Sequence, residues 1–553
     1  MKPWVAAMMV GWWLASALPS PAATAPPVAG LDPAQLADAA RRVRADVEFL
    51  AADELEGRDT GSRGHRIAAD YVAAQFRAMG LAPGGSNGGW LVEVPFRRAE
   101  HRTPPRLTLT VGGRAQPLVN GRDAALAPSL TEADRHVTAR LVFVGYGLDD
   151  RRFGYHDYAG LDLTGRIAVA VHGTPAGLPR EIAAHLGASK AAIAAAHGAI
   201  GLVELPRPGE DRGGLDRQGQ PRLSWVDGEG HVGNQPPGLR VGLSVSRATA
   251  EHLFDHGPAS LAAIECGPGS PRGFALDAAI QIEASDQWRD FSSPEVIGRL
   301  AGGDPAVAGE QVALMAHLDH LGIDPAPRPG ADAIFNGALD NAAGVATMLE
   351  AARETTAGPH PRRAMLFIAN TGEEKGLLGA NYLADHPPAG GPIVGVVDLD
   401  MPLLLYPFTD VSAFGADHST IAEAVASAGR TMGVAVSPDP LPEQSLFIRS
   451  DHYMFVKRGV PAVLLMTGFA NGGAAEWRRF LATTYHSPRD DLSQAIDWQA
   501  GRATRCSTSG SRRPWPTRPT DRAGTPAIIS AICTMKVGRA HPSRPQNRRR
   551  ILD

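Results

Sequence analysis

Residues that can bind metal ions follow several apolar runs of this sequence. His317 comes directly after QVALMA, Glu373 and Glu374 follow AMLFIA and the letters NTG, and Asp400 ends the letters DLD after IVGVV. Neutral imidazoles and carboxylates are ligands of zinc, at distances of about 2.0–2.2 Å. The residue types therefore favour a metal centre.

Further polar residues stand near these positions or at the end of the same region. They are Asp319, Asp340, Asp398, Tyr485 and His486. Several carboxylates that converge without a cation would repel one another and take up protons. A pair of divalent ions about 3.5–4 Å apart removes that repulsion, and one carboxylate can bridge such a pair around a hydrolytic water.

Each residue also has a structural interpretation when it is taken alone. Asp340, at the start of a predicted helix, is compatible with a helix N-cap, and Glu373 and Glu374 are compatible with a solvated turn. A single histidine after a strand is commonly held by a hydrogen bond. The metal centre is predicted from the joint position of these residues. Because no thiolates accompany them, a structural cysteine-type zinc site is not expected.

The apolar runs are predicted to be strands of a buried parallel sheet. QVALMA, AMLFIA, IVGVV and PAVLLM are nearly continuous runs of five or six apolar residues, which suit strands covered on both faces. Helical segments such as AAGVATMLEAARE lie between them, so the predicted fold class is α/β, with a doubly wound, mostly parallel sheet. Ligands of such sheets bind beyond the carboxyl ends of the strands, where the polar residues stand.

Two other regions precede this sheet. Residues 35–85 are predicted to be helical, with an apolar stripe that ends at Gly80. The stripe consists of Ile67, Tyr71, Val72, Phe76 and Met79. Residues 126–275 alternate strand-like runs with an alanine-rich helix from Lys190 to His197, which indicates a small inserted domain that is β-rich or α/β.

Five motifs resemble those of one enzyme family. AHLDHLG, GALDNAAGVATMLE, TGEEKGLLGANY, DLDM and YHSPRDD occur in this order between about residues 290 and 500. They resemble the dizinc aminopeptidases of peptidase family M28, to which glutamate carboxypeptidase and glutaminyl cyclase enzymes are related. EGRDTGSRGHRIAADYVAAQFRAMGL is similar to the helical start of such enzymes. The region 126–275 is similar to a protease-associated domain inserted in their catalytic fold, the zinc exopeptidase fold.

The resemblance implies a role for each motif residue. One zinc ion is expected on His317 and Asp400, a second on Glu374 and His486, and Asp340 is expected to bridge them. Glu373 is expected to be the general base, which takes a proton from water and passes it to the leaving amine.

Two supporting roles are implied in the same way. Asp319 is expected to orient His317 from behind, which fixes the tautomer and strengthens the ligand. Tyr485 is expected to hydrogen-bond the oxyanion, although a tyrosine beside a ligand histidine can also simply pack. His320 is interpreted as a loop residue or a group behind a ligand. Outside the metal set, one motif is left open between structural hydrogen bonding and catalysis: Ser450, Asp451 and His452 in RSDHYMF.

The function expected from the resemblance is that of a secreted zinc-dependent exopeptidase. It would bind two zinc ions, with other divalent metals as alternatives, and remove amino-terminal residues from peptide substrates. A carboxypeptidase or a glutaminyl-cyclase-like enzyme on the same metal site is a second possibility. A non-catalytic peptide-binding module is a third, but such modules can lose metal ligands, and here the proposed set is complete.

Composition and charge place the chain among folded proteins. It has 553 residues, of which 44% are apolar and 20% charged, enough for two or three domains. The formal net charge of −4 gives no reason to expect a nucleic acid partner. The body has a single cysteine, Cys266, and so cannot form an internal disulfide.

Both ends of the chain differ from the body. Residues 1–25 contain Lys2, the apolar run from Trp4 to Leu18 and then small residues, which is typical of a secretory signal peptide. That run is shorter than the roughly 20 residues of a membrane span, so a periplasmic or secreted protein without a stable membrane anchor is expected. Residues 501–553 carry 12 basic and 2 acidic side chains, against 42 and 56 in the other 500 residues. They are predicted to be a disordered or frameshifted basic tail.

The predicted domains follow from these boundaries. Residues 30–125 form the first part of the peptidase domain, 126–275 the inserted domain and 276–500 the catalytic remainder. The oligomeric state is left open.

Overall fold

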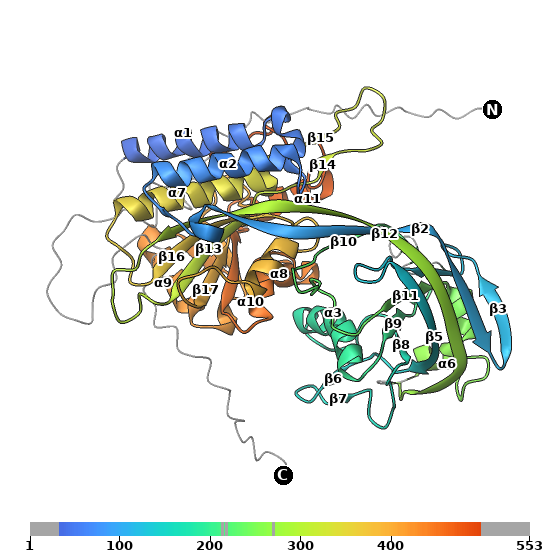
Figure 1. Cartoon of the computed structure of the whole chain (residues 1–553). Helices are drawn as coiled ribbons and strands as arrows, with labels where there is room; N and C mark the ends of the chain where they lie inside the picture. The colour runs from blue at the N-terminus through green and yellow to red at the C-terminus, as the bar shows by residue number, and fades with distance from the viewer. Residues whose placement is uncertain (1–32, 212–214, 216–218, 268–270, 499–553) are drawn as a thin grey trace, which may run out of the picture.

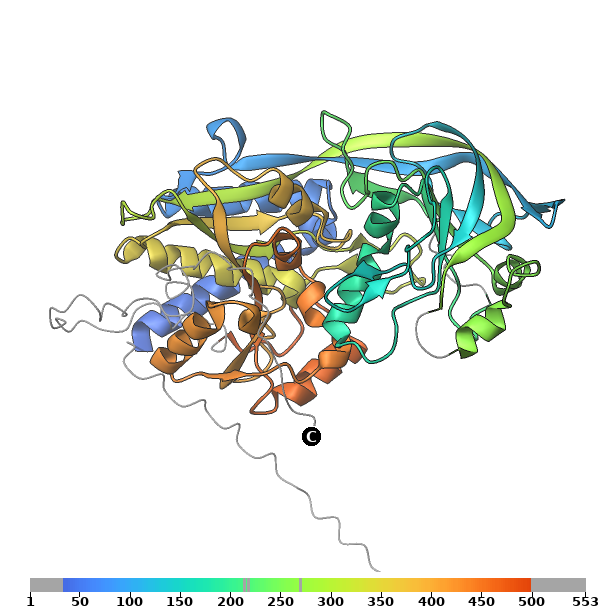
Figure 2. The ribbon, with the colours of Figure 1, turned by 90° about the horizontal axis from the view of Figure 1, so that it is seen from below.

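The computed structural model describes residues 33–498 except 212–214, 216–218 and 268–270, and it has two lobes (Figure 1). Two long antiparallel strands, β2 (Leu91–Val111) and β12 (Phe274–Leu300), run from one lobe into the other. Figure 2 shows the same pair crossing both lobes from a second direction. Because each lobe adds its own strands to this pair, one sheet continues through both.

The larger lobe contains the predicted parallel strands. These are β13 (Gln311–His317), β16 (Ala364–Asn370), β17 (Ile393–Asp398) and β20 (Ala462–Thr467), in the spatial order β20-β17-β13-β16 and all parallel. Antiparallel strands flank them: β12 pairs with β16, and β18 (Asp410–Phe414) pairs with β20. The short strand β19 (Ala435–Ser437) closes the edge. The predicted α/β fold with a mostly parallel sheet is therefore confirmed.

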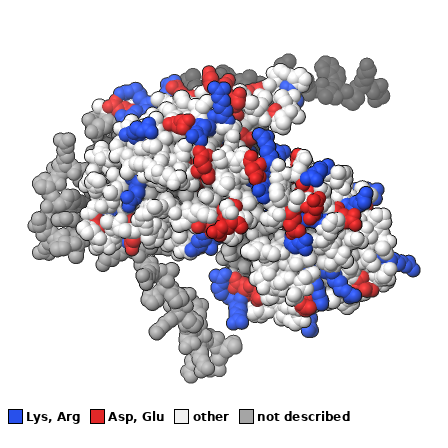
Figure 3. All heavy atoms as spheres, viewed as in Figure 1, with Lys and Arg blue, Asp and Glu red and all other residues white. Residues whose placement is uncertain are grey.

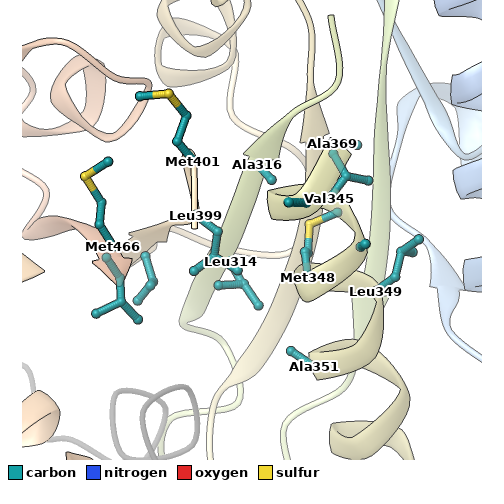
Figure 4. Close-up of a cluster of buried hydrophobic side chains, with 14 of the residues drawn as sticks. Leu314, Ala316, Val345, Met348, Leu349, Ala351, Ala369, Leu399, Met401 and Met466 are labelled. Carbon is teal, nitrogen blue, oxygen red and sulfur yellow. The ribbon is translucent and has the colours of Figure 1, made fainter. Parts of the chain in front are cut away.

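Both faces of this sheet are covered, as the apolar runs predict. Leu314 and Ala316 of β13 face one buried cluster, whereas Ala313 and Met315 face another. Figure 4 shows Leu314 and Ala316 beside side chains of a neighbouring helix, α7. Such fully buried aliphatic side chains stabilise the fold by about 1.5–3 kcal/mol each, so strands without a polar face suit this position.

Helices supply the two covering layers. The first layer consists of α1 (Pro33–Leu50), α2 (Arg63–Ala78), α7 (Ala343–Ala357), α9 (Ile421–Met432) and α11 (Gly473–Thr483). The second consists of α8 (Leu378–Asp385) and α10 (His452–Val456). This arrangement is the expected doubly wound one.

The predicted helical start consists of two helices, α1 and α2. α2 begins after Ser62, whose hydroxyl accepts a hydrogen bond from the His65 backbone N–H. Its stripe packs inward through Val72 and Phe76, both fully buried, and the chain leaves the helix at Gly80 with φ +78°. Between α1 and α2 lies a turn at Asp53–Arg58.

The smaller lobe extends beyond residues 126–275, which were predicted to be the inserted domain. Its buried apolar cluster runs from Leu107 to Ala284, so it includes parts of β2 and β12 beyond 126–275. Its strands are β3 (Arg114–Leu118), β4 (Ala124–Leu126), β5 (Asp134–Phe143), β8 (Ile167–Ala170), β9 (Gly201–Glu204), β10 (Arg222–Trp225) and β11 (Val241–Val245). Its helices are α3 (Arg180–Ala196), α5 (Arg247–His252) and α6 (Leu261–Cys266). Helix α3 begins ahead of the alanine-rich stretch expected from Lys190.

The remaining strands are two-residue pieces at the edges. They are β1 (Ala82–Pro83), which pairs with β12, and the hairpins of β6 (Asp149–Asp150) with β7 (Tyr155–His156) and of β14 (Gly322–Ile323) with β15 (Ile334–Phe335).

The two lobes touch at several places besides the long strands, and two of these contacts involve side chains of the second covering layer. Trp225 of β10 donates from Nε1 to Oδ1 of Asn381 in α8 at 2.7 Å. His185 of α3 lies 2.6 Å from the Tyr453 hydroxyl of α10, measured from its Nδ1 atom. The smaller lobe therefore packs against the helices of the second covering layer.

Several predictions concern the surface and the ends. Basic and acidic side chains are interspersed over the face seen in Figure 3. Cys266 is a free, exposed thiol. None of the helices in the described ranges is long and apolar enough to cross a bilayer. The predicted signal peptide and basic tail lie outside the described residues. Residues 491–497 form no helix, and the Asp497 backbone N–H donates a hydrogen bond to the Leu404 backbone oxygen.

Candidate metal centre

Adjacent parallel strands bring the predicted ligands to one edge of the sheet. His317 is the last residue of β13, which lies between β16 and β17. Glu374 follows β16, and Asp400 follows β17. Asp340 lies in a helical turn at Ala338–Ala342 that leads into α7. The carboxyl ends of neighbouring parallel strands meet at one edge, so these side chains converge.

Asp340 stands at the middle of the cluster and presents a different oxygen to each side. Its Oδ1 atom lies 3.2 Å from Nε2 of His317, which is also 3.2 Å from Oδ1 of Asp400. Its Oδ2 atom lies 3.2 Å from Nε2 of His486, which is 3.3 Å from Oε2 of Glu374. Each of the five predicted metal ligands is thus in contact with at least one other, and Asp340 connects the two sides.

These separations suit atoms that share a metal ion. Two ligand atoms of a tetrahedral zinc ion at about 2.0–2.1 Å are about 3.3–3.4 Å apart. One geometric group is formed by His317, Asp340 and Asp400. The second geometric group is formed by His320, Asp340 and Glu374. His486 contacts the same two carboxylates.

The electrostatics also fit a cation. Among the described residues, neither Lys nor Arg forms an ion pair with Asp340, Glu374 or Asp400, although all three are buried or nearly so. Burial opposes ionisation of Asp340, but hydrogen bonds from His317 and His486 outweigh it, and the pKa of this carboxyl is lowered. Burial and the neighbouring carboxylates raise the pKa of Asp400. Divalent ions would balance this concentration of acidic groups.

Glu373, the predicted base, lies beside the ligands without being one of the paired groups. Burial, with the charges of Glu374 and Asp400, raises the pKa of its carboxyl well above the usual value, although His317 opposes the shift. Its backbone N–H donates to Oδ1 of Asp319 at 3.2 Å. A carboxylate with a raised pKa is suited to accept a proton near neutral pH.

The position of Asp319 corrects the route by which His317 is oriented. Nδ1 of His317 lies 3.0 Å from the backbone oxygen of Asp319, not from its carboxylate. The carboxylate accepts hydrogen bonds from the Thr60 hydroxyl at 2.8 Å and from the Glu373 backbone. The backbone oxygen of Asp319 therefore orients His317, and the carboxylate of Asp319 holds the loop that carries Glu373.

Tyr485 packs against the ligand histidine His486, which is the alternative to an oxyanion role. Its ring stacks on His486 with centroids 3.7 Å apart. Burial, together with nearby carboxylates, raises the pKa of its hydroxyl, so the group stays protonated. The oxyanion role stays a prediction.

His320 lies closer to the centre than its interpretation as a loop residue suggested. It is fully buried, and its Nδ1 atom lies 2.7 Å from Oε1 of Glu374 and 3.9 Å from Oδ2 of Asp340. It therefore contacts the same carboxylates as His486. The spacing HLDH, which places a second histidine three residues after His317, is the sequence signal for it.

Two residues that the sequence reasoning missed hold the ligand loops. Arg58 is buried and donates to backbone oxygens of the segments that carry His317 and Asp340, including Leu318 at 2.9 Å and Gly337 at 3.1 Å. Asp490 accepts backbone hydrogen bonds from Leu339 and from Asp340 at 3.0 and 2.9 Å. Both occur in quoted motifs, EGRD and YHSPRDD, but their partners are backbone groups that a sequence does not display.

The RSDHYMF motif supports the strand ends. Asp398 accepts hydrogen bonds from the Ser450 hydroxyl at 2.7 Å and the His452 backbone at 3.1 Å. Asp451 accepts one from Asn370 at 2.7 Å. These contacts favour structural hydrogen bonding over catalysis for this motif. They also occupy Asp398, which is not one of the proposed metal ligands.

Comparison with known proteins agrees with the family resemblance. The sequence model of Peptidase family M28 matches residues 295–506, which include every predicted ligand, so the predicted family is confirmed for this segment. Over 103 residues the chain is 37% identical to the "Alkaline phosphatase isozyme conversion protein" of Escherichia coli K12, a match that covers 17% of this chain and 27% of that protein.

Solved structures to which the chain is similar include two aminopeptidases. An aminopeptidase from Aneurinibacillus sp. strain AM-1 has a TM-score of 0.45 and 20% identity, with 89% of this chain and 93% of that chain covered. A zinc aminopeptidase from Bacillus subtilis has a TM-score of 0.39 and 19% identity, with 84% and 92% covered.

Proposed function

We propose that this chain, whose residues 295–506 match Peptidase family M28, is a secreted zinc-dependent exopeptidase that removes amino-terminal residues from peptides. The single observation that carries the proposal is the position of Asp340, which offers one oxygen to His317 and the other to His486, each at 3.2 Å. A carboxylate in that position can bridge two ions.

The residues divide the work of hydrolysis. His317 and Asp400 would hold one zinc ion, Glu374 and His486 the other, and Asp340 both. When bound, such ions lower the pKa of a water molecule and polarise the peptide carbonyl. Glu373 would accept a proton from the attacking water as the water oxygen bonds to the peptide carbonyl carbon. It would then deliver that proton to the nitrogen of the leaving amine as the C–N bond breaks.

Supporting contacts keep this arrangement in place. Asp319 holds the backbone of Glu373, and Asp490 holds that of Asp340. Since a proton acceptor must be within hydrogen-bond reach of its donor, fixed loops at both positions favour a productive geometry. Export across the inner membrane is proposed from the sequence of residues 1–25.

The test combines metal content with substrate choice. The purified chain should bind about two zinc ions and hydrolyse aminoacyl chromogenic substrates, and a chelator should abolish the activity until zinc is restored. Peptides with free and acetylated amino termini are compared in the same assay. Cleavage of acetylated peptides alone would reject the aminopeptidase and favour the carboxypeptidase alternative. Metal binding without hydrolysis of any substrate would favour the binding module.

A further inference from the structure

A cavity in the smaller lobe carries an excess of positive charge. It has a volume of about 350 Å³ and lies between β10, α3 and the segment 234–242. Three arginines line it, Arg135, Arg222 and Arg240, whereas none of its lining residues in the described ranges is acidic. The question is which of these charges is already neutralised within the protein.

Two of the three arginines have acidic partners. Arg240 makes a two-pronged contact with Glu132, at 2.7 and 2.6 Å. Arg135, which is 1% exposed, donates to Asp286 at 2.9 Å and to the backbone oxygen of Ala127 at 2.7 Å. Each of these charges is therefore balanced by a carboxylate at hydrogen-bond distance.

Arg222 has no such partner. Across the described part of the chain, no carboxylate lies within ion-pair distance of it and its side chain makes no hydrogen bond. Burial and the charge of Arg135 lower the pKa of its guanidinium to about 10, so it still carries a positive charge at neutral pH. Arg222 is half-buried and lines the cavity, so an anion that enters the cavity can reach its guanidinium and supply the missing counter-charge.

The cavity also offers unused hydrogen-bonding atoms. Nε of Arg135 is buried and has no partner, so a further donor is available beside Arg222. Oε1 of Gln235 is likewise buried and unpartnered, and it can accept a hydrogen bond from an N–H or O–H of a ligand. Oxyanions that carry such a donor are peptide carboxylates, with their neighbouring amide, and hydrogen phosphate.

The wall of the cavity touches the catalytic loop. Asn234 lines the cavity, and its Nδ2 atom donates to the backbone oxygen of Gly376 at 3.4 Å, two residues after Glu374. Asn381 of α8 donates to Oδ1 of the same asparagine at 3.2 Å. Asn234 alone would therefore separate a ligand in the cavity from the loop that carries the proposed base.

We propose that this cavity is an oxyanion-binding site in which Arg222 pairs with a carboxylate or phosphate group. Two sources share this chemistry: an acidic group of a peptide substrate, which rests on the proposed function, and a free anion. Guanidinium groups suit both, because their planar N–H groups match two oxygens of a carboxylate or phosphate.

The first arm of the test measures binding without any reaction. Equilibrium dialysis of the full chain against radiolabelled inorganic phosphate should show an occupied site whose affinity falls about 10- to 100-fold in Arg222→Gln. Arg222→Lys, which keeps the charge but not the fork, should retain part of the binding. The matched control is Arg106→Gln on β2 of the same lobe, whose side chain is 87% exposed; it should bind as the wild type does.

The second arm identifies a peptide source. Tetrapeptides with a free amino terminus and either Glu or Gln at a downstream position are compared by KM and kcat. A carboxylate site predicts a lower KM for the Glu peptides in the wild type, a difference that disappears in Arg222→Gln while kcat for the Gln peptides is that of the wild type. An unfolding curve accompanies each variant. Because Arg222 is half-buried and forms no ion pair within the described part of the chain, its replacement should not lower the midpoint of Arg222→Gln.

The outcomes separate the two sources and the two proposals. Phosphate binding that depends on Arg222, without a preference for Glu peptides, assigns a free anion as the ligand. A preference for Glu peptides that depends on Arg222, without phosphate binding, assigns the peptide substrate. Phosphate binding that depends on Arg222 in a chain that hydrolyses no peptide supports this site and rejects the proposed function. Equal phosphate affinity and equal peptide preference in wild type and Arg222→Gln would overturn the inference.

Discussion

His486 reaches Asp340 from the opposite end of the catalytic segment, and its Nε2 atom lies 3.2 Å from Oδ2 of that aspartate. The contact joins a loop after α11 to the turn before α7. Since Oδ1 of Asp340 faces His317 at the same distance, one carboxylate connects both halves of the cluster. Much of the proposed chemistry depends on this residue.

Replacing Asp340 should remove metal as well as activity. In Asp340→Ala both groups of ligands lose their shared member, so we expect clearly less than the wild-type content of about two ions per chain and no measurable hydrolysis. Metal analysis after gel filtration gives the content. Asp70→Ala, an exposed position on α2, is the control and should keep both properties. A fully metallated Asp340→Ala would contradict a bridging role.

Glu373 should be separable from metal binding. Its carboxylate forms no ion pair with the cluster histidines, and Glu374 is the residue in contact with His486 and His320. Glu373→Gln removes a proton acceptor at nearly constant shape, so kcat should fall about 10²- to 10⁴-fold while the zinc content stays that of the wild type. Near-normal turnover in a metallated Glu373→Gln would reject this residue as the base.

Arg58 should be a stability determinant with a local effect on the site. Its guanidinium donates to the backbone oxygens of Leu50, Leu318, Asn336 and Gly337, and it is 1% exposed. Arg58→Ala leaves buried carbonyl groups without donors, so the free energy of unfolding should fall by at least about 3 kcal/mol. Urea denaturation measures this loss. Arg58→Lys should recover only part of it, because an ammonium group cannot reach all four oxygens; full recovery would show that charge alone matters.

The fold of the larger lobe could be predicted because its strands need no polar face. Runs such as QVALMA and AMLFIA are buried on both sides, and a sheet that must hide such runs leaves few arrangements. The two lobe-spanning strands could not be predicted in this way. β2 contains Pro104, Pro105 and several charged residues, and its partner β12 is far away in the sequence. Pairing between distant segments is not visible in local periodicity.

The ligands were predictable from position, and their supports were not. His317 and Asp400 directly follow apolar strands, so the edge of the sheet gathers them. Arg58 and Asp490 act on backbone atoms of other loops, and nothing in their own surroundings in the sequence identifies those atoms. His320 was undervalued because its contact with Glu374 depends on how the loop after β13 bends back, a feature set by tertiary packing.

His65 should make the stability of the larger lobe depend on acidity. It is fully buried in α2, its Nε2 atom has no partner, and Nδ1 lies 3.3 Å from the Ser293 hydroxyl. Burial, with the charges of Arg58 and Arg66, lowers the pKa of its imidazole to about 3. In the unfolded chain the same group titrates near its ordinary value of about 6.5. Between these two values the unfolded chain binds the proton and the folded one does not.

The sign of the pH dependence follows from that difference. Above pH 6.5 both states hold neutral His65 and the residue has no effect, whereas from about pH 6.5 down to about 3 it lowers the free energy of unfolding by about 1.4 kcal/mol per pH unit. His65→Gln removes the titration, so its unfolding free energy should fall less steeply over pH 6.5 to 4.5 by that amount. The exposed His360→Gln should keep the wild-type slope. Parallel curves for His65→Gln and the wild type would mean that the folded protein accepts the proton at this position.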